Sequence, residues 1–160
     1  MTKFKAIKTS RIVLAGKKLS LIIMILFLTF CNKDKGPDIP EAYVNIYLRP
    51  NSIDYIADGT WVYVTANEPS RGIIVYRLFH DSFKAYERTC TYDPNACCTS
   101  SSSVLSCSKL TVEFSGLTIT DTCCHSQFLI TDGTPFSGPA TFSLKEYNTE
   151  YDGDVLHIFN

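Results

Sequence analysis

The chain has 160 residues, 45% of them hydrophobic and 19% charged, which suits about one globular domain and a tail. Six of its fifteen basic residues, and none of its sixteen acidic ones, lie before residue 31. Residues 31–160 therefore carry a net charge of −7, although the net charge of the whole chain is only −1. An acidic domain repels phosphate backbones, so the composition argues against nucleic-acid binding.

The N-terminal segment has the pattern of a secretory signal peptide. A basic stretch, residues 1–18, precedes a largely apolar run over residues 19–30, which is shorter than the roughly 20 residues of a spanning helix. The run ends in Leu28-Thr29-Phe30-Cys31, which resembles a lipobox, although Phe30 stands where a small residue is expected. We expect residues 1–30 to be removed and Cys31 to carry lipid. The alternative is a plain signal anchor with an incidental cysteine.

The polar segment after Cys31 predicts a flexible tether. Residues 32–40 (NKDKGPDIP) contain one glycine and two prolines and no apolar pattern. We therefore assign residues 31–41 to the anchor cysteine and its tether. A polar start of this kind resembles outer-membrane lipoproteins of the Bacteroides and Flavobacterium type. The resemblance implies a bacterial cell envelope location, at the outer membrane, with the membrane as a partner through the lipid.

Residues 42–160 have the pattern of an all-β domain. Alternating or β-branched runs occur at 44–48, 61–65, 72–78, 110–114 and 155–158. Turn signals lie between such runs, at Asp58-Gly59, His80-Asp81, Asp132-Gly133 and Asp152-Gly153. The serine-rich residues 99–103 are expected to form a surface loop. These patterns predict about ten short antiparallel strands and at most a turn of helix.

Six of the seven cysteines fall within one short span: Cys90, Cys97, Cys98, Cys107, Cys123 and Cys124. Such density indicates either a metal site or a set of disulfides. An exported protein meets an oxidising compartment, and lipidation of Cys31 would leave an even number of cysteines, so disulfides are favoured. A zinc site using Cys97, Cys98, Cys107 and His125 is the alternative, but its ligand spacing is poor.

Several blocks of the sequence resemble the Rieske iron–sulfur fold in order. They are residues 72–78, Cys90-Thr91-Tyr92, residues 121–128 and Ser137-Gly138-Pro139-Ala140. Together they cover roughly residues 42–160. The resemblance implies a Rieske-like antiparallel β-sandwich with two cysteine-bearing loops at one tip.

The cluster ligands of that family are degenerate in this chain. Rieske proteins hold a two-iron cluster through Cys-x-His in the first loop and Cys-x-x-His in the second. The corresponding positions here are Cys90, Tyr92, Asp121 and Cys124, and His125 falls one place too late. A phenol and a carboxylate are poor ligands for an iron–sulfur core. We therefore expect no cofactor and no metal. Electron transfer through a [2Fe–2S] cluster is the alternative.

The resemblance also reduces the number of possible disulfide pairings among the six cysteines. It implies a Cys90–Cys124 bond in place of the cluster, with Tyr92 and Asp121 filling the vacated space and hydrogen bonding to each other or to nearby backbone. Cys123 would then pair with Cys97 or Cys98, and Cys107 with whichever of those two remains. The Cys90–Cys124 bond could also be redox-labile.

Nothing in the sequence indicates a catalytic site. There is no Gly-x-Ser-x-Gly elbow and no Cys-x-x-Cys pair. His80 and His157 are expected on the surface or on a sheet face. The sequence thus predicts a non-enzymatic envelope lipoprotein whose domain is a binding or structural module, and it does not identify a protein partner.

Overall fold

The computed structural model describes residues 36–37, 39, 41–95, 98–101 and 104–160. These residues belong to one compact unit, Gly36–Asn160. The predicted signal peptide and lipidated Cys31 lie outside the described residues, as does Cys97, so those assignments and the domain boundaries stay predictions. Across the described ranges no helix is long and apolar enough to cross a membrane.

The described residues form twelve short strands and no α-helix. The strands are β1 (Asn45–Leu48), β2 (Trp61–Val64), β3 (Ile73–Phe79), β4 (Ser82–Glu87), β5 (Cys98–Ser101), β6 (Val104–Cys107), β7 (Thr111–Val112), β8 (Thr118–Thr120), β9 (Gln127–Leu129), β10 (Pro135–Ser137), β11 (Asn148–Tyr151) and β12 (Leu156–Phe159).

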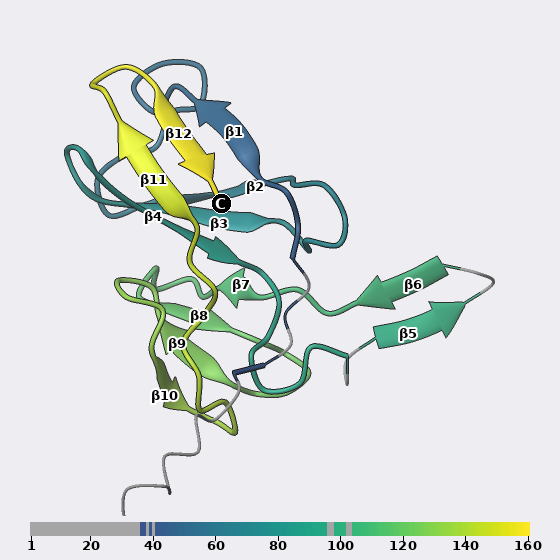
Figure 1. Cartoon of the computed structure of the whole chain (residues 1–160). Helices are drawn as coiled ribbons and strands as arrows, with labels where there is room; N and C mark the ends of the chain where they lie inside the picture. Colours follow the sequence, from purple (N-terminus) through teal and green to yellow (C-terminus); the bar gives the residue numbers. More distant parts are fainter. Residues whose placement is uncertain (1–35, 38, 40, 96–97, 102–103) are drawn as a thin grey trace, which may run out of the picture. The chain divides into compact units, whose positions relative to one another are not determined.

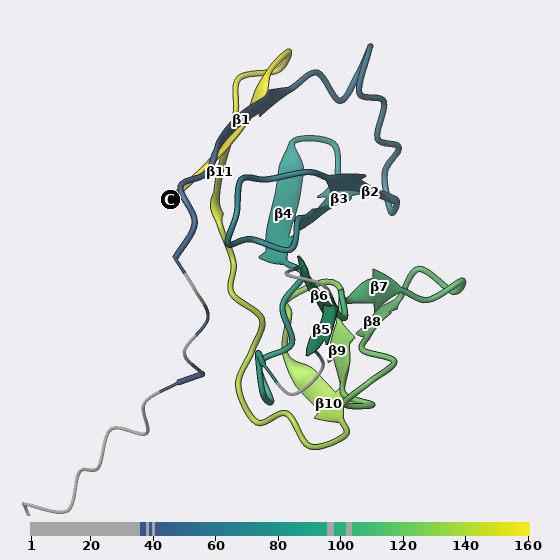
Figure 2. The same cartoon turned by 90° about the vertical axis from the view of Figure 1, so that its right-hand side faces the viewer.

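The strands pair into four antiparallel sheets. Their orders are β1-β12-β11, β2-β3-β4, β10-β9-β8-β7 and the hairpin β5-β6. The two three-stranded sheets lie together, the four-stranded sheet lies beyond them, and the β5-β6 hairpin projects from the side (Figures 1 and 2). The prediction of an all-β domain of short antiparallel strands is confirmed.

Strand β3 is buried on both faces over residues 73–76, which explains the unbroken apolar run there. Side chains alternate between the two faces of a strand. Ile73 and Val75 accordingly enter one core with side chains of β1, β4 and β12. Ile74 and Tyr76 enter a second core with side chains of β8 and β9. The sheet β2-β3-β4 is therefore the central layer, and it supports the loops that follow β4 and β8.

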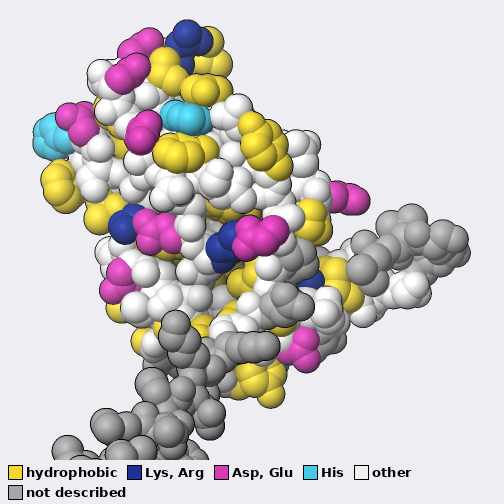
Figure 3. Space-filling model, in the orientation of Figure 1, with side chains coloured by type: hydrophobic (Ala, Val, Ile, Leu, Met, Phe, Trp, Pro, Cys, Tyr) yellow, Lys and Arg dark blue, Asp and Glu magenta, His cyan; other side chains and the backbone are white. Residues whose placement is uncertain are grey.

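Stacked rings cover part of the outer face of β1 and β12. The Tyr47 and His157 ring centroids lie 4.4 Å apart, and the His157 and Phe159 centroids lie 4.6 Å apart. Figure 3 shows hydrophobic side chains and a histidine gathered on this face. His80, in the turn between β3 and β4, has an 84% exposed side chain. Both histidines thus lie where the sequence placed them, on the surface or on a sheet face.

Two local predictions are wrong. Of the expected surface loop at residues 99–103, residues 99–101 instead belong to β5, whose first residue, Cys98, faces Cys107 of β6, and residues 102–103 lie outside the described residues. Phe114 does not continue the alternation of β7 and is fully exposed. The chain turns back there, because the Gly116 N–H donates to the Glu113 carbonyl and the Glu113 N–H donates to the Thr118 carbonyl.

Candidate functional site

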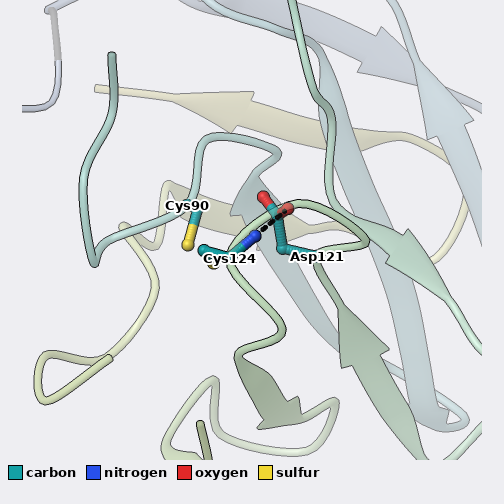
Figure 4. Close-up of side chains that lie close together, drawn as sticks. All are labelled: Cys90, Asp121 and Cys124. Carbon is teal, nitrogen blue, oxygen red and sulfur yellow. Dashed lines mark hydrogen bonds between the residues drawn. The ribbon is translucent and has the colours of Figure 1, made fainter. Parts of the chain in front are cut away.

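Two loops meet beside the second core. The first loop, residues 88–92, follows β4, and the second loop, residues 121–126, connects β8 to β9. Cys90 of the first loop and Asp121 and Cys124 of the second bring one donor atom each to within 4.8 Å of one another. Figure 4 shows the two cysteine side chains next to each other, with Asp121 beside Cys124 and joined to its backbone nitrogen by a hydrogen bond. The predicted meeting of two cysteine-bearing loops at one tip is confirmed.

Asp121 organises the backbone of the second loop. It is fully buried, and its Oδ1 accepts hydrogen bonds from the backbone N–H groups of Cys123 at 2.7 Å and Cys124 at 3.1 Å. The Ser108 hydroxyl donates to the same atom at 3.4 Å. This is the local side-chain-to-backbone bonding by which aspartate shapes turns. The prediction that Asp121 bonds to nearby backbone is therefore confirmed.

The other oxygen of Asp121 is in a different situation. Asp121 Oδ2 is buried and has no hydrogen-bond partner among the residues that the structure describes. A buried carboxylate oxygen without a partner has lost its hydrogen bonds to water and has no hydrogen bond within the protein to compensate, which is energetically unfavourable. This atom is the one unsatisfied group of the three donor residues.

A third segment packs on the second loop through Ser126. The hydroxyl of this fully buried residue accepts hydrogen bonds from Cys124 Sγ at 3.3 Å and from the Ala140 N–H at 3.1 Å. Gly138 approaches so closely that an added Cβ would lie 2.4 Å from the His125 carbonyl oxygen. Its φ of +88° also favours glycine. The Gly-Pro-Ala segment singled out in the sequence thus supports the loop that carries Cys124.

Cys90 and Cys124 are free thiols, which corrects the predicted Cys90–Cys124 disulfide. Instead of a covalent bond, the two side chains share a hydrogen bond, and Cys124 also donates to Ser126. Cys90 is 1% exposed, and its burial, aided by the contact with Cys124, raises the pKa of its thiol to about 12. The Tyr92 N–H, which is directed at the Cys90 sulfur, lowers this pKa in part. Cys90 is therefore a neutral thiol at ordinary pH.

Tyr92 does not occupy the space predicted for it. Its side chain is 55% exposed, and only its backbone N–H reaches Cys90. The expectation that its phenol fills a vacated cluster site is wrong. His125 is likewise exposed, with a left-handed φ of +57°. Of the four positions that the sequence resemblance aligns with cluster ligands, three therefore have side chains that converge, and the fourth does not.

The remaining described cysteines are cross-linked. Cys98 and Cys107 form a disulfide, which confirms that Cys107 pairs with one of Cys97 and Cys98. Cys123 is also disulfide-bonded, and its partner lies outside the described residues. The zinc site considered from Cys97, Cys98, Cys107 and His125 is excluded in this structure, because two of its thiolates are consumed in the disulfide.

Arg71 brings a positive charge close to the site, and no sequence motif pointed to it. Its guanidinium donates to the Ser108 carbonyl at 3.0 Å, to the Pro94 carbonyl and to the Cys98 sulfur at 3.3 Å. Burial lowers the pKa of Arg71, while the negative charges of Glu87 and Asp121 oppose this. The side chain thus neutralises part of the charge around the loops without bonding to either oxygen of Asp121.

A second buried carboxylate fixes the start of the first loop. Glu87 is 1% exposed and accepts four hydrogen bonds, from the Ser70 hydroxyl, the Arg71 N–H, the Thr89 hydroxyl and the Tyr147 hydroxyl. Burial, followed by the hydrogen bond to Glu87, raises the pKa of Tyr147. Unlike Asp121, Glu87 has partners for both of its oxygens.

No family model matches this sequence, and no curated protein matches it. Among solved structures, the chain is similar to the ferredoxin of carbazole 1,9a-dioxygenase from Nocardioides aromaticivorans IC177, with a TM-score of 0.46 and 15% identity over 74% of this chain and 98% of that one. It is also similar to a chain from a complex of reduced oxygenase and oxidised ferredoxin in carbazole 1,9a-dioxygenase. That match has a TM-score of 0.43 and 25% identity, over 71% of this chain and 93% of the other.

Proposed function

We propose that this protein is a membrane-anchored envelope lipoprotein whose Rieske-like domain lacks the two-iron cluster and acts as a binding or structural module. The N-terminal sequence supports the anchor, through its basic start, its short apolar run and the lipobox-like residues that end at Cys31. The two disulfides that involve described cysteines support an oxidising compartment such as the envelope.

The donor set carries the proposal. A Rieske cluster is held by two cysteines on one iron and two histidines on the other. Here Cys90 and Cys124 offer two thiols, Asp121 offers a hard carboxylate, and the fourth position is Tyr92, whose side chain is 55% exposed. Soft thiolate and imidazole donors are what an iron–sulfur core requires. The residues present therefore do not fit the cluster.

The two loops also have supports of their own. Asp121 shapes the second loop, Ser126 ties it to Ala140, and Glu87 fixes the start of the first loop. A loop pair held by buried hydrogen bonds and flanked by a disulfide does not need a cluster to be ordered. A rigid tip of this kind suits the binding or structural role that we propose.

The iron and sulfide content of the purified protein tests the proposal. The full chain, purified anaerobically in detergent, is expected to contain neither iron nor acid-labile sulfide and to have no visible absorption band, before and after a standard cluster reconstitution. Two irons and two sulfides per chain would overturn the proposal and support the alternative, an electron-transfer protein.

A matched variant shows whether the identity of the four side chains is what prevents the protein from binding a cluster. The triple variant Tyr92→His, Asp121→Cys, Cys124→His restores the family's ligand types at all four positions. It should take up a cluster in the same reconstitution that leaves the wild type colourless. Far-UV circular dichroism of both proteins separates failure to bind from failure to fold.

A further inference from the structure

The site that does not fit two irons has the composition of a site for one ion. Cys90, Asp121 and Cys124 come from two loops, and their donor atoms lie within 4.8 Å of one another (Figure 4). Cys90 and Asp121 are buried and Cys124 is partly exposed. Solvent therefore reaches the group of donor atoms at Cys124. Three protein ligands with an open fourth position are typical of a mononuclear zinc-class centre.

The unsatisfied oxygen of Asp121 is a second observation that favours a cation at this group. Asp121 is fully buried, and its Oδ1 accepts three hydrogen bonds while its Oδ2 accepts none from the described residues. Leaving a buried polar atom unpaired is unfavourable, and it is more so for a charged group. The nearby Arg71 does not supply the missing partner, because its guanidinium bonds to two carbonyls and a sulfur instead.

We propose that Cys90, Asp121 and Cys124 bind a single thiophilic divalent cation of the zinc class, with a water molecule at the fourth position. The two thiolates select such an ion over Mg²⁺ or Ca²⁺, which prefer all-oxygen sites. This inference rests on the proposed absence of the two-iron cluster, and it replaces the expectation from the sequence that the site is metal-free.

Binding of the divalent cation needs no oxidant or reductant. Two S–H bonds break and two metal–sulfur bonds form, so each bound ion releases two protons to solvent. The carboxylate adds a third bond with no proton change. Two thiolates and one carboxylate around a divalent ion leave one net negative charge, which the adjacent guanidinium of Arg71 offsets.

The neighbouring groups already have the arrangement that ligand sulfurs need. The Tyr92 N–H is directed at the Cys90 sulfur, where it can donate to a thiolate. Ser126 Oγ lies 3.3 Å from Cys124 Sγ and accepts from the Ala140 N–H, so its own proton is free to point at the Cys124 thiolate. Hydrogen bonds to the ligands are the usual support of a protein metal site.

Titration with cobalt tests the proposal. Co²⁺ is added to the full chain in detergent, purified anaerobically without reductant so that the existing disulfides stay closed. One Co²⁺ per chain should bind, with a thiolate-to-cobalt charge-transfer band, tetrahedral d–d bands and the release of two protons per ion. Added Zn²⁺ should displace the Co²⁺ and abolish the bands.

Three variants assign the ligands. Asp121→Asn keeps an acceptor for the loop N–H groups but removes the charge, and Cys124→Ser removes one sulfur; each should weaken binding at least about tenfold. His125→Asn is the matched control, because His125 is exposed beside Cys124 and asparagine tolerates its left-handed backbone. This control should bind Co²⁺ like the wild type.

Several results would overturn the inference. They are the absence of charge-transfer bands at saturating Co²⁺, a Co²⁺ affinity that is unchanged in either Asp121→Asn or Cys124→Ser, loss of binding in His125→Asn, or alkylation showing that Cys90 and Cys124 form a disulfide in the purified protein. Failure of the proposed function looks different, since it requires two irons and two sulfides per chain.

Discussion

At the scale of single residues, the buried polar atoms of this domain fall into satisfied and unsatisfied groups. Both oxygens of Glu87 accept hydrogen bonds, and one of the four donors is the Tyr147 hydroxyl at 2.8 Å. The Tyr86 hydroxyl is buried too, yet it has no partner among the described residues. Burial raises the pKa of both tyrosines, so both hydroxyls are neutral at physiological pH.

This contrast gives a matched pair of substitutions that remove one oxygen each. Tyr147→Phe withdraws a donor from a buried carboxylate and should lower the free energy of unfolding by about 1–3 kcal/mol. Tyr86→Phe removes an unpaired hydroxyl and should leave that free energy unchanged or raise it. Urea denaturation with equal m-values for both variants measures the difference. Equal losses in the two variants would contradict the prediction.

At the scale of elements, the close packing of residues 137–140 on the second loop depends on Gly138. A Cβ there would lie 2.4 Å from the His125 carbonyl oxygen and 2.6 Å from the Ser126 Cα, both backbone atoms that cannot swing aside. The positive φ adds about 1–2 kcal/mol of strain for any residue with a Cβ. The segment and the loop must therefore separate if this glycine is replaced.

Gly138→Ala should destabilise the domain by more than the strain alone, about 3 kcal/mol or more. Gly59→Ala is the control, because Gly59 has a similar φ of +75° but nothing within 4 Å of its Cβ position. It should cost only about 1–2 kcal/mol. The free energy of unfolding of each variant checks this, and equal costs would show that the close approach is not what requires glycine at 138.

Elements with an apolar pattern could be predicted from the sequence, and elements without one could not. The alternation over residues 44–48 and 61–65 and the run at 72–78 correspond to β1, β2 and β3, because burial on one or both faces determines those side chains. The β5-β6 hairpin is rich in serine and shows no such pattern; the Cys98–Cys107 disulfide closes it instead. Disulfide pairing cannot be deduced from spacing alone.

The candidate site, like the fold, could be predicted from the sequence only in part. Motif positions correctly brought Cys90, Asp121 and Cys124 together, but they also placed Tyr92 there, since a motif fixes the backbone position and not the direction of a substituted side chain. The role of Asp121 in its turn could have been predicted, because aspartate commonly bonds the backbone two residues on. Arg71 lies far from both loops in sequence, and no local pattern marks it.

At the scale of the whole molecule, the N-terminal segment and the rest of the chain carry net charges of opposite sign. Residues 1–30 carry six positive charges, and residues 31–160 carry a net charge of −7. An acidic domain is repelled by anionic lipid surfaces, so electrostatics cannot hold it at a membrane. The membrane attachment that we propose would therefore depend on covalent lipid, and stable anchoring takes more than one acyl chain.

The proposed anchor makes Cys31 the residue on which membrane attachment depends. In cells fed a labelled fatty acid, the wild-type protein should incorporate label and have residue 31 as its mature N-terminus, whereas Cys31→Ala should lose the label. Phe30→Ala supplies the small residue that the lipobox pattern expects before the cysteine, so it should be processed and labelled at least as well as the wild type. Equal labelling of the wild type and Cys31→Ala would exclude lipidation at this position and leave the apolar run as a plain signal anchor.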